Sequence, residues 1–440
     1  MYILPLNKKI LYGMGQIGVT MPAFFLSTYI FVFYAPLHGR VIVDSYIIGI
    51  AVLVGTLVQA FVNPFIGQWS DKSRSRFGRR NFFLITGSLP IAFFYALIWF
   101  PFFSSITMGV MLFLYLIGFN FLYAYVVLPY LALIPEISVN SKDRVTLTTI
   151  ASYFSIIGII LASLLPSILL AVNVRFSYIG LIVSIVTTLS FLIVFLSIKE
   201  NPEVPKIPNE FTIKEAVVQT FRNKTFDRYI VSYLFFQFGF YFFLSSLGYF
   251  VENIVLPGNP HYESYIGLLT LVAVLSTIAF SPLLVFYSRR YGEKSSFILF
   301  TALLGIVIIS AFFVGLIPFG NKLIETLIIM VLSGIGLTSY FILPNAIVSE
   351  IIDEDELATG YRREGMYFGI QGMLERIPSG LSGYVLGTWI AYFYIPTGND
   401  IYVRSLTLIG GLSIIVTSLL FVRVPLKENI KKTENLKKDH

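Results

Sequence analysis

Long apolar runs separated by short polar segments dominate the pattern of the chain. Most runs hold 20 to 30 residues, and an α-helix needs about 20 apolar residues to cross the hydrocarbon core of a bilayer. The runs lack a period-two alternation of apolar and polar positions, so the pattern predicts helices rather than barrel strands. Twelve membrane spans are predicted: 10–36, 43–69, 80–103, 106–135, 145–172, 174–198, 226–256, 262–288, 294–318, 322–350, 364–396 and 401–423.

The distribution of Lys and Arg between these spans predicts an orientation. If the N-terminus is cytoplasmic, 26 of the 31 basic residues lie on the cytoplasmic side, four lie outside, and Arg376 lies within a span. Cytoplasmic loops are enriched in Lys and Arg, and a missed span would reverse every later segment. We therefore expect an even number of spans, cytoplasmic termini and a location in the cell membrane.

The composition supports a membrane protein and argues against several other classes. The chain of 440 residues is 56% hydrophobic and 12% charged, whereas soluble domains are about 25% charged. It has no cysteine, which excludes disulfides and thiolate sites. The absence of a Walker A motif argues against an ATP-driven pump. We expect no cofactor, no metal, no enzymatic activity and no nucleic-acid partner, since the net charge of +7 comes from the loops.

The longest polar interruption divides the chain into two halves of six spans each. The predicted domains are an N-terminal bundle (1–198), a cytoplasmic linker (199–225), a C-terminal bundle (226–423) and a basic cytoplasmic tail (424–440).

The two halves also share short sequence matches. RFGRR (76–80) recurs as RYGEK (290–294), and the LP at 128–129 recurs at 343–344. The predicted fold class is an all-α membrane protein with two pseudo-symmetric six-helix bundles. Repeats of this kind place a substrate site at their interface, near the midplane of the membrane.

Two charged loops on the cytoplasmic side are candidate gates. In NPFIGQWSDKSRSRFGRR (63–80), Gly67 would let two helices approach closely, and Asp71 is expected within reach of Arg74, Arg76 or Arg144. In DEDELATGYRREG (353–365), acids such as Asp355 are expected to pair across the cytoplasmic mouth, and Arg363 is a further gating candidate. The alternatives are arginines that only set topology and a solvated loop.

A few acids and one arginine lie inside or near the predicted spans. Glu375 and Arg376 fall near the middle of the eleventh span, where a charge is costly and usually serves function. Glu375 is a candidate proton carrier and Arg376 a candidate substrate contact, against the alternative of a structural pair. Glu252 is a second candidate, but its place near the outer end of the seventh span favours an exposed loop acid. Glu136 is expected to face cytoplasmic water and to pair locally.

The same segments resemble a known family. The 63–80 loop resembles the signature of the major facilitator superfamily. DEDELATGYRREGMYFGI (353–370) and LPYLALIPEI (128–137) resemble the glycoside–pentoside–hexuronide symporters, the melibiose-permease group. The resemblance implies twelve helices in two bundles and transport of a sugar or glycoside by alternating access, coupled to a proton or sodium ion. It also implies a lysine at the position of Arg376.

The chain departs from the acidic cation site of that group. Gln59 and Asn63 stand where the resemblance implies two aspartates before Pro64, and Val127 stands where it implies a third acid. Sodium coupling through such a site is therefore not expected. Gln59 and Asn63 remain candidate contacts to substrate hydroxyls.

Sugar recognition needs aromatic faces together with amide and hydroxyl partners. Further substrate-binding candidates within the spans are Gln16, Asn120, Tyr123, Gln237, Tyr241, Asn345 and Gln371. Each of these residues has helix–helix hydrogen bonding as its alternative role.

The sequence therefore predicts a secondary transporter of a sugar or glycoside, with a proton as the candidate coupling ion. The alternatives are a transporter of another amphiphile such as a lysolipid, and a non-transporting membrane sensor or enzyme. Neither a catalytic cluster nor a large extramembrane domain is evident in the sequence.

Overall fold

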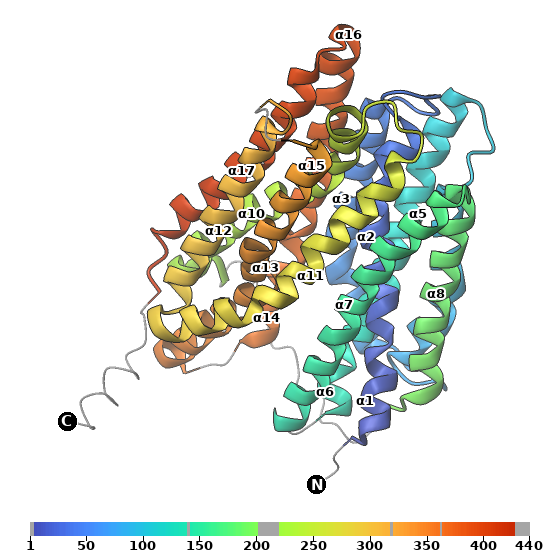
Figure 1. Ribbon diagram of the computed structural model, residues 1–440. Helices are drawn as coiled ribbons and strands as arrows, with labels where there is room; N and C mark the ends of the chain where they lie inside the picture. The colour runs from blue at the N-terminus through green and yellow to red at the C-terminus, as the bar shows by residue number, and fades with distance from the viewer. Residues whose placement is uncertain (1–3, 139–140, 201–219, 317–319, 361–362, 427–440) are drawn as a thin grey trace. The chain divides into compact units, whose positions relative to one another are not determined.

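The computed structural model describes residues 4–138, 141–200, 220–316, 320–360 and 363–426. These residues form helices and loops, with no strand among them (Figure 1). Eleven of the helical segments have the length and hydropathy needed to cross a membrane. The chain is thus an all-α, multi-pass membrane protein. Most of the predicted linker (201–219) and tail (427–440) lies outside the described residues.

The helices of the first half correspond to the six predicted spans. They are α1 (Leu6–Gly13), α2 (Gly15–Tyr34), α3 (Ser45–Lys72), α4 (Asn81–Ile98), α5 (Ser105–Ala132), α6 (Ile134–Ile137), α7 (Ser141–Ala171) and α8 (Phe176–Ser197). α1 and α2 together make the first span, with Met14 at the junction between them.

The second half contains longer helices and two π-helical segments. They are α10 (Lys224–Phe250), the π-helix η1 (Val251–Val255), α11 (Tyr262–Tyr291), α12 (Glu293–Ser310), the 3₁₀-helix η2 (Ala311–Phe313), α13 (Lys322–Thr359), α14 (Glu364–Leu374), α15 (Arg376–Trp389), the π-helix η3 (Ile390–Tyr394), α16 (Ile395–Thr397) and α17 (Asp400–Phe421).

The eleventh predicted span is not one continuous helix. α14 ends at Leu374, and α15 begins at Arg376. Pro378 has no backbone N–H, so the carbonyl of Leu374 loses its intrahelical donor. Glu375 lies at the junction with φ −63° and ψ −16°. The break therefore places the candidate proton carrier at the junction of two helices.

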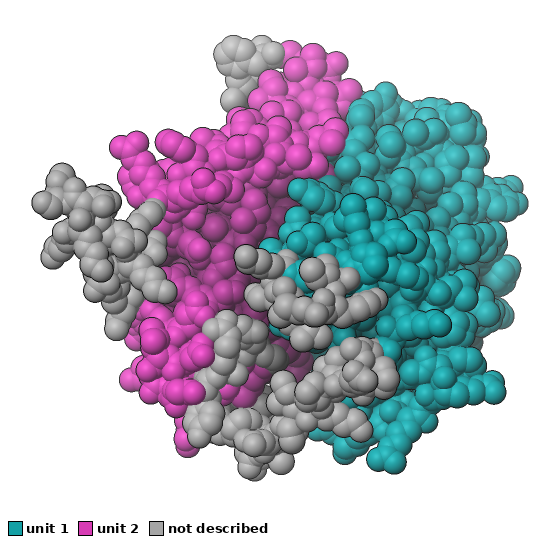
Figure 2. All heavy atoms as spheres, turned by 90° about the horizontal axis from the view of Figure 1, so that it is seen from below, with its two compact units in different colours: residues 1–208, 244–271, 379–402 teal, residues 209–243, 272–378, 403–440 magenta. Residues whose placement is uncertain are grey.

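The chain divides into two compact units, which Figure 2 shows in different colours. Unit 1 comprises residues 1–208, 244–271 and 379–402. Unit 2 comprises residues 209–243, 272–378 and 403–440. Unit 1 thus holds the first six spans and, in addition, terminal segments of the seventh, eighth and eleventh spans.

Each unit has its own helix packing. In unit 1, α2 packs against α7 and α8, and α5 packs against α3 and α4 (Figure 1). In unit 2, α12 packs along α13. The buried residues are mainly large apolar and aromatic side chains, such as Phe25, Trp99 and Tyr130 in unit 1 and Phe297 in unit 2.

Large apolar side chains also cover much of the surface of the helices. In unit 1, Leu89, Phe93 and Leu196 are 67%, 61% and 77% exposed. Soluble proteins rarely expose extended apolar surfaces, whereas lipid tails are themselves apolar. These faces therefore fit contact with the acyl chains of a bilayer.

Candidate substrate site and gating clusters

The break between α14 and α15 is the centre of a polar cluster in unit 2. The Tyr233 hydroxyl of α10 lies 3.3 Å from Glu375 Oε2. Arg376 Nη2 lies 3.4 Å from Glu375 Oε1, with both side chains about three-quarters buried. Gln237 Nε2 donates to the Tyr233 hydroxyl at 2.5 Å. Three candidates of unit 2, Gln237, Glu375 and Arg376, are therefore linked through Tyr233, which was not predicted from the sequence.

Amide groups and aromatic rings border this cluster. Gln371, one turn before Glu375, also interacts with the Tyr233 hydroxyl. Within the described residues, the amide oxygens of Gln237 and Gln371 are buried and have no hydrogen-bond partner. Buried polar atoms without a partner are uncommon in proteins. The two oxygens are thus available to accept hydrogen bonds from a solute.

The aromatic part of the cluster comes from α10 and α13. Tyr229 and Tyr233 stack with ring centroids 5.6 Å apart, and Phe240 stacks on Tyr340 at 4.1 Å. The side chain of Tyr241 interacts with that of Tyr340. Aromatic faces combined with a few polar groups are the usual lining of a small-molecule site.

The polar candidates in unit 1 have different surroundings. Gln59 is 5% exposed, and the Asn63 amide oxygen is buried without a partner among the described residues. By contrast, Asn120 donates to the Leu116 carbonyl of its own helix at 2.8 Å. The Tyr123 hydroxyl donates to the Val19 carbonyl at 2.9 Å.

Gln16 and Asn345 complete the set of candidates. The Gln16 side chain interacts with Tyr130, and Asn345 lies in α13 of unit 2. In unit 1, Gln59 and Asn63 are therefore the candidates whose surroundings best fit a substrate contact. Asn120 and Tyr123 hold helix contacts instead.

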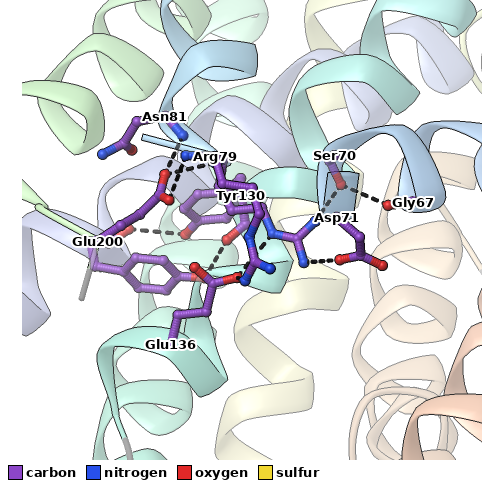
Figure 3. Close-up of polar contacts among 10 residues, drawn as sticks. Gly67, Ser70, Asp71, Arg79, Asn81, Tyr130, Glu136 and Glu200 are labelled. Carbon is purple, nitrogen blue, oxygen red and sulfur yellow. Dashed lines mark hydrogen bonds and ion pairs between the residues drawn. The ribbon is translucent and has the colours of Figure 1, made fainter. Parts of the chain in front are cut away.

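A charged cluster centred on Arg80, the residue before α4, joins the end of α3 to α6 in unit 1 (Figure 3). Arg80 forms an ion pair with Asp71 and donates to the Ser70 hydroxyl. Arg80 Nε lies 3.0 Å from Glu136 Oε1, and Arg79 Nη2 lies 2.6 Å from the same oxygen. Glu136 is 6% exposed, so the expected local pair exists but is buried rather than facing water.

Glu200 holds the start of α4 from the other side of this cluster. Its carboxylate accepts the backbone N–H groups of Arg79, Arg80 and Asn81, each at 2.6 Å (Figure 3). The first N–H groups of a helix have no intrahelical acceptor, and the helix dipole favours a negative charge there. Glu200 thereby fixes the two arginines that reach Glu136.

The other gating candidates have neighbours different from those expected. Asp71 pairs with Arg80, whereas Arg76 packs over the Phe77 ring at 4.7 Å. Arg144 donates to the Ser138 carbonyl at 3.4 Å. A Cβ added at Gly67 would meet no atom within 4 Å, so the close helix approach expected there is not present in this structure.

The charged segment before α14 contains a well-formed ion pair. Arg363 Nε and Nη2 donate to the two carboxylate oxygens of Asp355 at 2.9 and 2.8 Å. Both side chains are largely buried. This bidentate pair lies within unit 2, and it joins the end of α13 to the start of α14.

Two features of unit 1 were not found from the sequence. Lys9 Nζ and Asp143 Oδ1 form a buried ion pair at 2.5 Å between α1 and α7. The expectation that Glu252 is exposed is wrong, because it is 2% exposed in η1. The chain continues for one π-helical turn, and the loop after α2 covers this acid.

Comparison with known proteins identifies the family. The family described as "MFS/sugar transport protein" matches residues 11–428. The chain belongs to this family. It is 24% identical over 405 residues to the isoprimeverose transporter of Lactiplantibacillus pentosus, covering 88% of this chain and 80% of that protein. It is 25% identical over 465 residues to an uncharacterized symporter of Synechocystis, covering 87% and 84%.

Solved structures show the same fold. The nucleoside transporter NupG matches with a TM-score of 0.66 at 17% identity, covering 95% of this chain and 98% of that one. A D-xylose–proton symporter matches with a TM-score of 0.63 at 15% identity, covering 95% and 96%. The major facilitator fold predicted from the sequence is thus confirmed, and the family is one of transporters rather than enzymes.

Proposed function

We propose that the protein is a secondary transporter that moves a sugar or glycoside across the cell membrane by alternating access. The observation that carries this proposal is the cluster of Tyr233, Gln237, Gln371, Glu375 and Arg376. It combines two buried amide oxygens that have no donor among the described residues with tyrosine rings and a charged pair. Hydroxyl groups on a solute would supply the missing donors, and the rings would pack on its C–H surfaces.

Glu375 is the proposed proton carrier. Its contacts to Tyr233 and Arg376 are long, 3.3 and 3.4 Å, and hydrogen bonds of this length are weak. A proton on Glu375 would remove the negative charge beside Arg376 and make the carboxyl group a donor. Arg376 would then be freer to bind an electron-rich oxygen of the substrate. Binding of the proton and binding of the solute are coupled in this scheme.

In unit 1, Gln59 and Asn63 are the proposed substrate contacts. Gln59 and Asn63 are amides, and the chain has no acid at these two positions or at Val127. Sodium prefers carboxylate and carbonyl oxygens of high charge density, so the proposed coupling ion is the proton. The relatives that are named symporters and the fold match to a proton symporter support this assignment.

The charged clusters at the ends of the helices are the proposed gates. Asp71 with Arg80 in unit 1, and Asp355 with Arg363 in unit 2, lie at helix ends that the Lys and Arg distribution assigns to the cytoplasm. Arg76 and Arg144 are candidates for contacts that form in another state of the cycle. Both termini are cytoplasmic in this proposal.

The experiment that tests the function is uptake into proteoliposomes of a panel of labelled sugars and glycosides. Proton and sodium gradients are imposed separately, and empty liposomes provide the background. At least one sugar is expected to accumulate with the inward proton gradient and to show no response to sodium. Accumulation that follows sodium would contradict the coupling proposal. Binding of lysolipid together with the absence of any sugar uptake would contradict the substrate class.

A further inference from the structure

Among the described residues of the second half, two π-helical turns occur, and both lie in unit 1. η1 extends α10 and η3 extends α15. Single π-helical turns are rare and often occur at functional sites. Here both lie in spans that belong to the second repeat, yet they contact residues of the first repeat. Both turns lie at the C-terminal ends of their spans. This is the end of unit 1 that holds the loop between α2 and α3, and the start of α1 lies at the other end.

The carboxylate of Glu252 in η1 binds the loop between α2 and α3. Its Oε2 accepts the backbone N–H of Leu37 at 3.0 Å, and its Oε1 accepts that of His38 at 2.7 Å. The side chain is almost fully buried. A buried carboxylate is stable only with such partners. Both oxygens of Glu252 are therefore used to hold a loop of the other half of the chain.

The neighbouring Asn253 binds the same loop and two further segments. Its amide oxygen accepts a hydrogen bond from the Tyr394 hydroxyl of η3 at 3.1 Å and lies 3.0 Å from His38 Nε2. Its amide nitrogen donates to Asp400 Oδ1 at 2.9 Å. The Asn253 side chain thus connects the end of the seventh span to the end of the eleventh, to the start of the twelfth and to the loop after the first.

A tight backbone contact lies beside these hydrogen bonds. The Ser45 hydroxyl at the start of α3 donates to the Gly387 carbonyl of α15 at 3.1 Å. A Cβ at Gly49 would lie 2.8 Å from the Gly383 carbonyl oxygen. Such an approach is possible only without a side chain. Ser45 is 1% exposed, so this end of the two repeats is closed in unit 1.

We propose that Glu252 and Asn253 form a latch that holds this end of the transporter closed. The inference rests on the proposed alternating-access function, which requires the two repeats to separate at one end and then at the other. The bonds of Glu252 to Leu37 and His38 join the repeats, so they must break when this end opens. The charge distribution of the loops assigns this end to the outside of the cell.

The latch includes charged and titratable groups from every element around it. Glu252 and Tyr249 belong to the seventh span, His38 to the loop after the first, and Tyr262 and Glu263 to the eighth. Tyr394 and Asp400 complete the set. The substitution Glu252→Gln weakens the two hydrogen bonds that Glu252 accepts from Leu37 and His38. Glutamine has one acceptor oxygen where glutamate has two.

The test measures opening directly. The chain has no cysteine, so Ser45→Cys provides a single thiol that is buried while the latch is closed. The purified protein in nanodiscs is treated with a water-soluble maleimide, and the labelling rate is followed. Glu252→Gln in this background is expected to raise the rate by about tenfold or more, as expected from losing a hydrogen bond to a charged group. Asn253→Ala is expected to act in the same direction.

Glu325→Gln is the matched control. Glu325 Oε2 accepts the Gly315 backbone N–H at 2.7 Å, but both residues belong to the second repeat and to unit 2. Its labelling rate is expected to equal that of Ser45→Cys alone. Equal rates for Glu252→Gln, Asn253→Ala and the control, in proteins that elute as single species, would overturn the latch. The assay needs no substrate, so this result would be distinct from a failure of sugar uptake.

Discussion

The hydroxyl of Tyr233 lies 3.3 Å from the carboxylate of Glu375, at the point where Pro378 interrupts the eleventh span. The same hydroxyl accepts a hydrogen bond from Gln237. Tyr233 is therefore the residue that connects the candidate proton carrier to the candidate substrate contacts. This connection gives a physical route by which a proton and a solute could affect each other's binding.

Replacing Tyr233 by Phe should separate these two roles. The variant keeps the aromatic ring but loses the hydroxyl that contacts Glu375 and Gln237. Substrate affinity is expected to fall by about tenfold, because one net hydrogen bond contributes about 1 kcal/mol and Gln237 loses its acceptor. Isothermal titration with the best sugar of the panel measures this change. An unchanged dissociation constant would show that Tyr233 does not order the site.

The free amide oxygens make a second prediction. Gln371→Leu removes a buried acceptor that has no protein partner among the described residues. Its affinity for the sugar is expected to fall by about tenfold, because the solute loses that acceptor, while its melting temperature changes little, because the contact to the Tyr233 hydroxyl is the one protein contact named here that is lost. Ser333→Ala is the control, since the Ser333 hydroxyl bonds only within α13 in the described structure. A loss of stability without a loss of affinity would assign Gln371 a structural role.

The Arg80 cluster predicts unequal effects for its two acids. Glu136 is buried and contacts both Arg79 and Arg80, whereas the Asp71 side chain is 41% exposed. Breaking a buried ion pair costs about 3–5 kcal/mol, and an exposed pair contributes less than about 1 kcal/mol. Glu136→Gln should therefore lower the melting temperature far more than Asp71→Asn in the same detergent. Equal shifts would show that the burial of Glu136 does not determine its contribution.

Two glycines of the 63–80 segment make opposite predictions. Gly78 has φ +104°, and a Cβ there would lie 2.6 Å from Glu200 Oε1. Gly78→Ala should destabilise the protein by about 1–3 kcal/mol through backbone strain and displacement of Glu200. Gly67 lies inside α3 with free space around it, so Gly67→Ala should be neutral or slightly stabilising. Thermal unfolding of both variants checks the contrast, and a stable Gly78→Ala protein would argue against the role of Glu200.

Hydropathy was sufficient to predict the helical fold. The apolar runs correspond to helices in the observed order, because the bilayer imposes a minimum length on each segment. The break at Glu375 could also have been read from Pro378, whose missing N–H is a local property of the sequence.

The partners of charged side chains could not be predicted in the same way. Asp71 has arginines at 74, 76, 79 and 80 within ten residues. The residue at which α4 begins decides which of these arginines faces Asp71. Glu252 looked exposed because it lies near the end of an apolar run. Its burial depends on a π-helical turn and on a loop more than 200 residues away in sequence. Such contacts follow from tertiary packing rather than from local pattern.

The most direct test of the central claim is a charge-movement measurement on proteoliposomes adsorbed to a solid-supported membrane. No ion gradient is imposed, and the sugar found in the uptake panel is added by rapid exchange. Wild-type protein is expected to give a transient inward current that also occurs without sodium, while Glu375→Gln still binds the sugar but gives no such current. Equal currents from the wild type and Glu375→Gln would contradict proton coupling through Glu375.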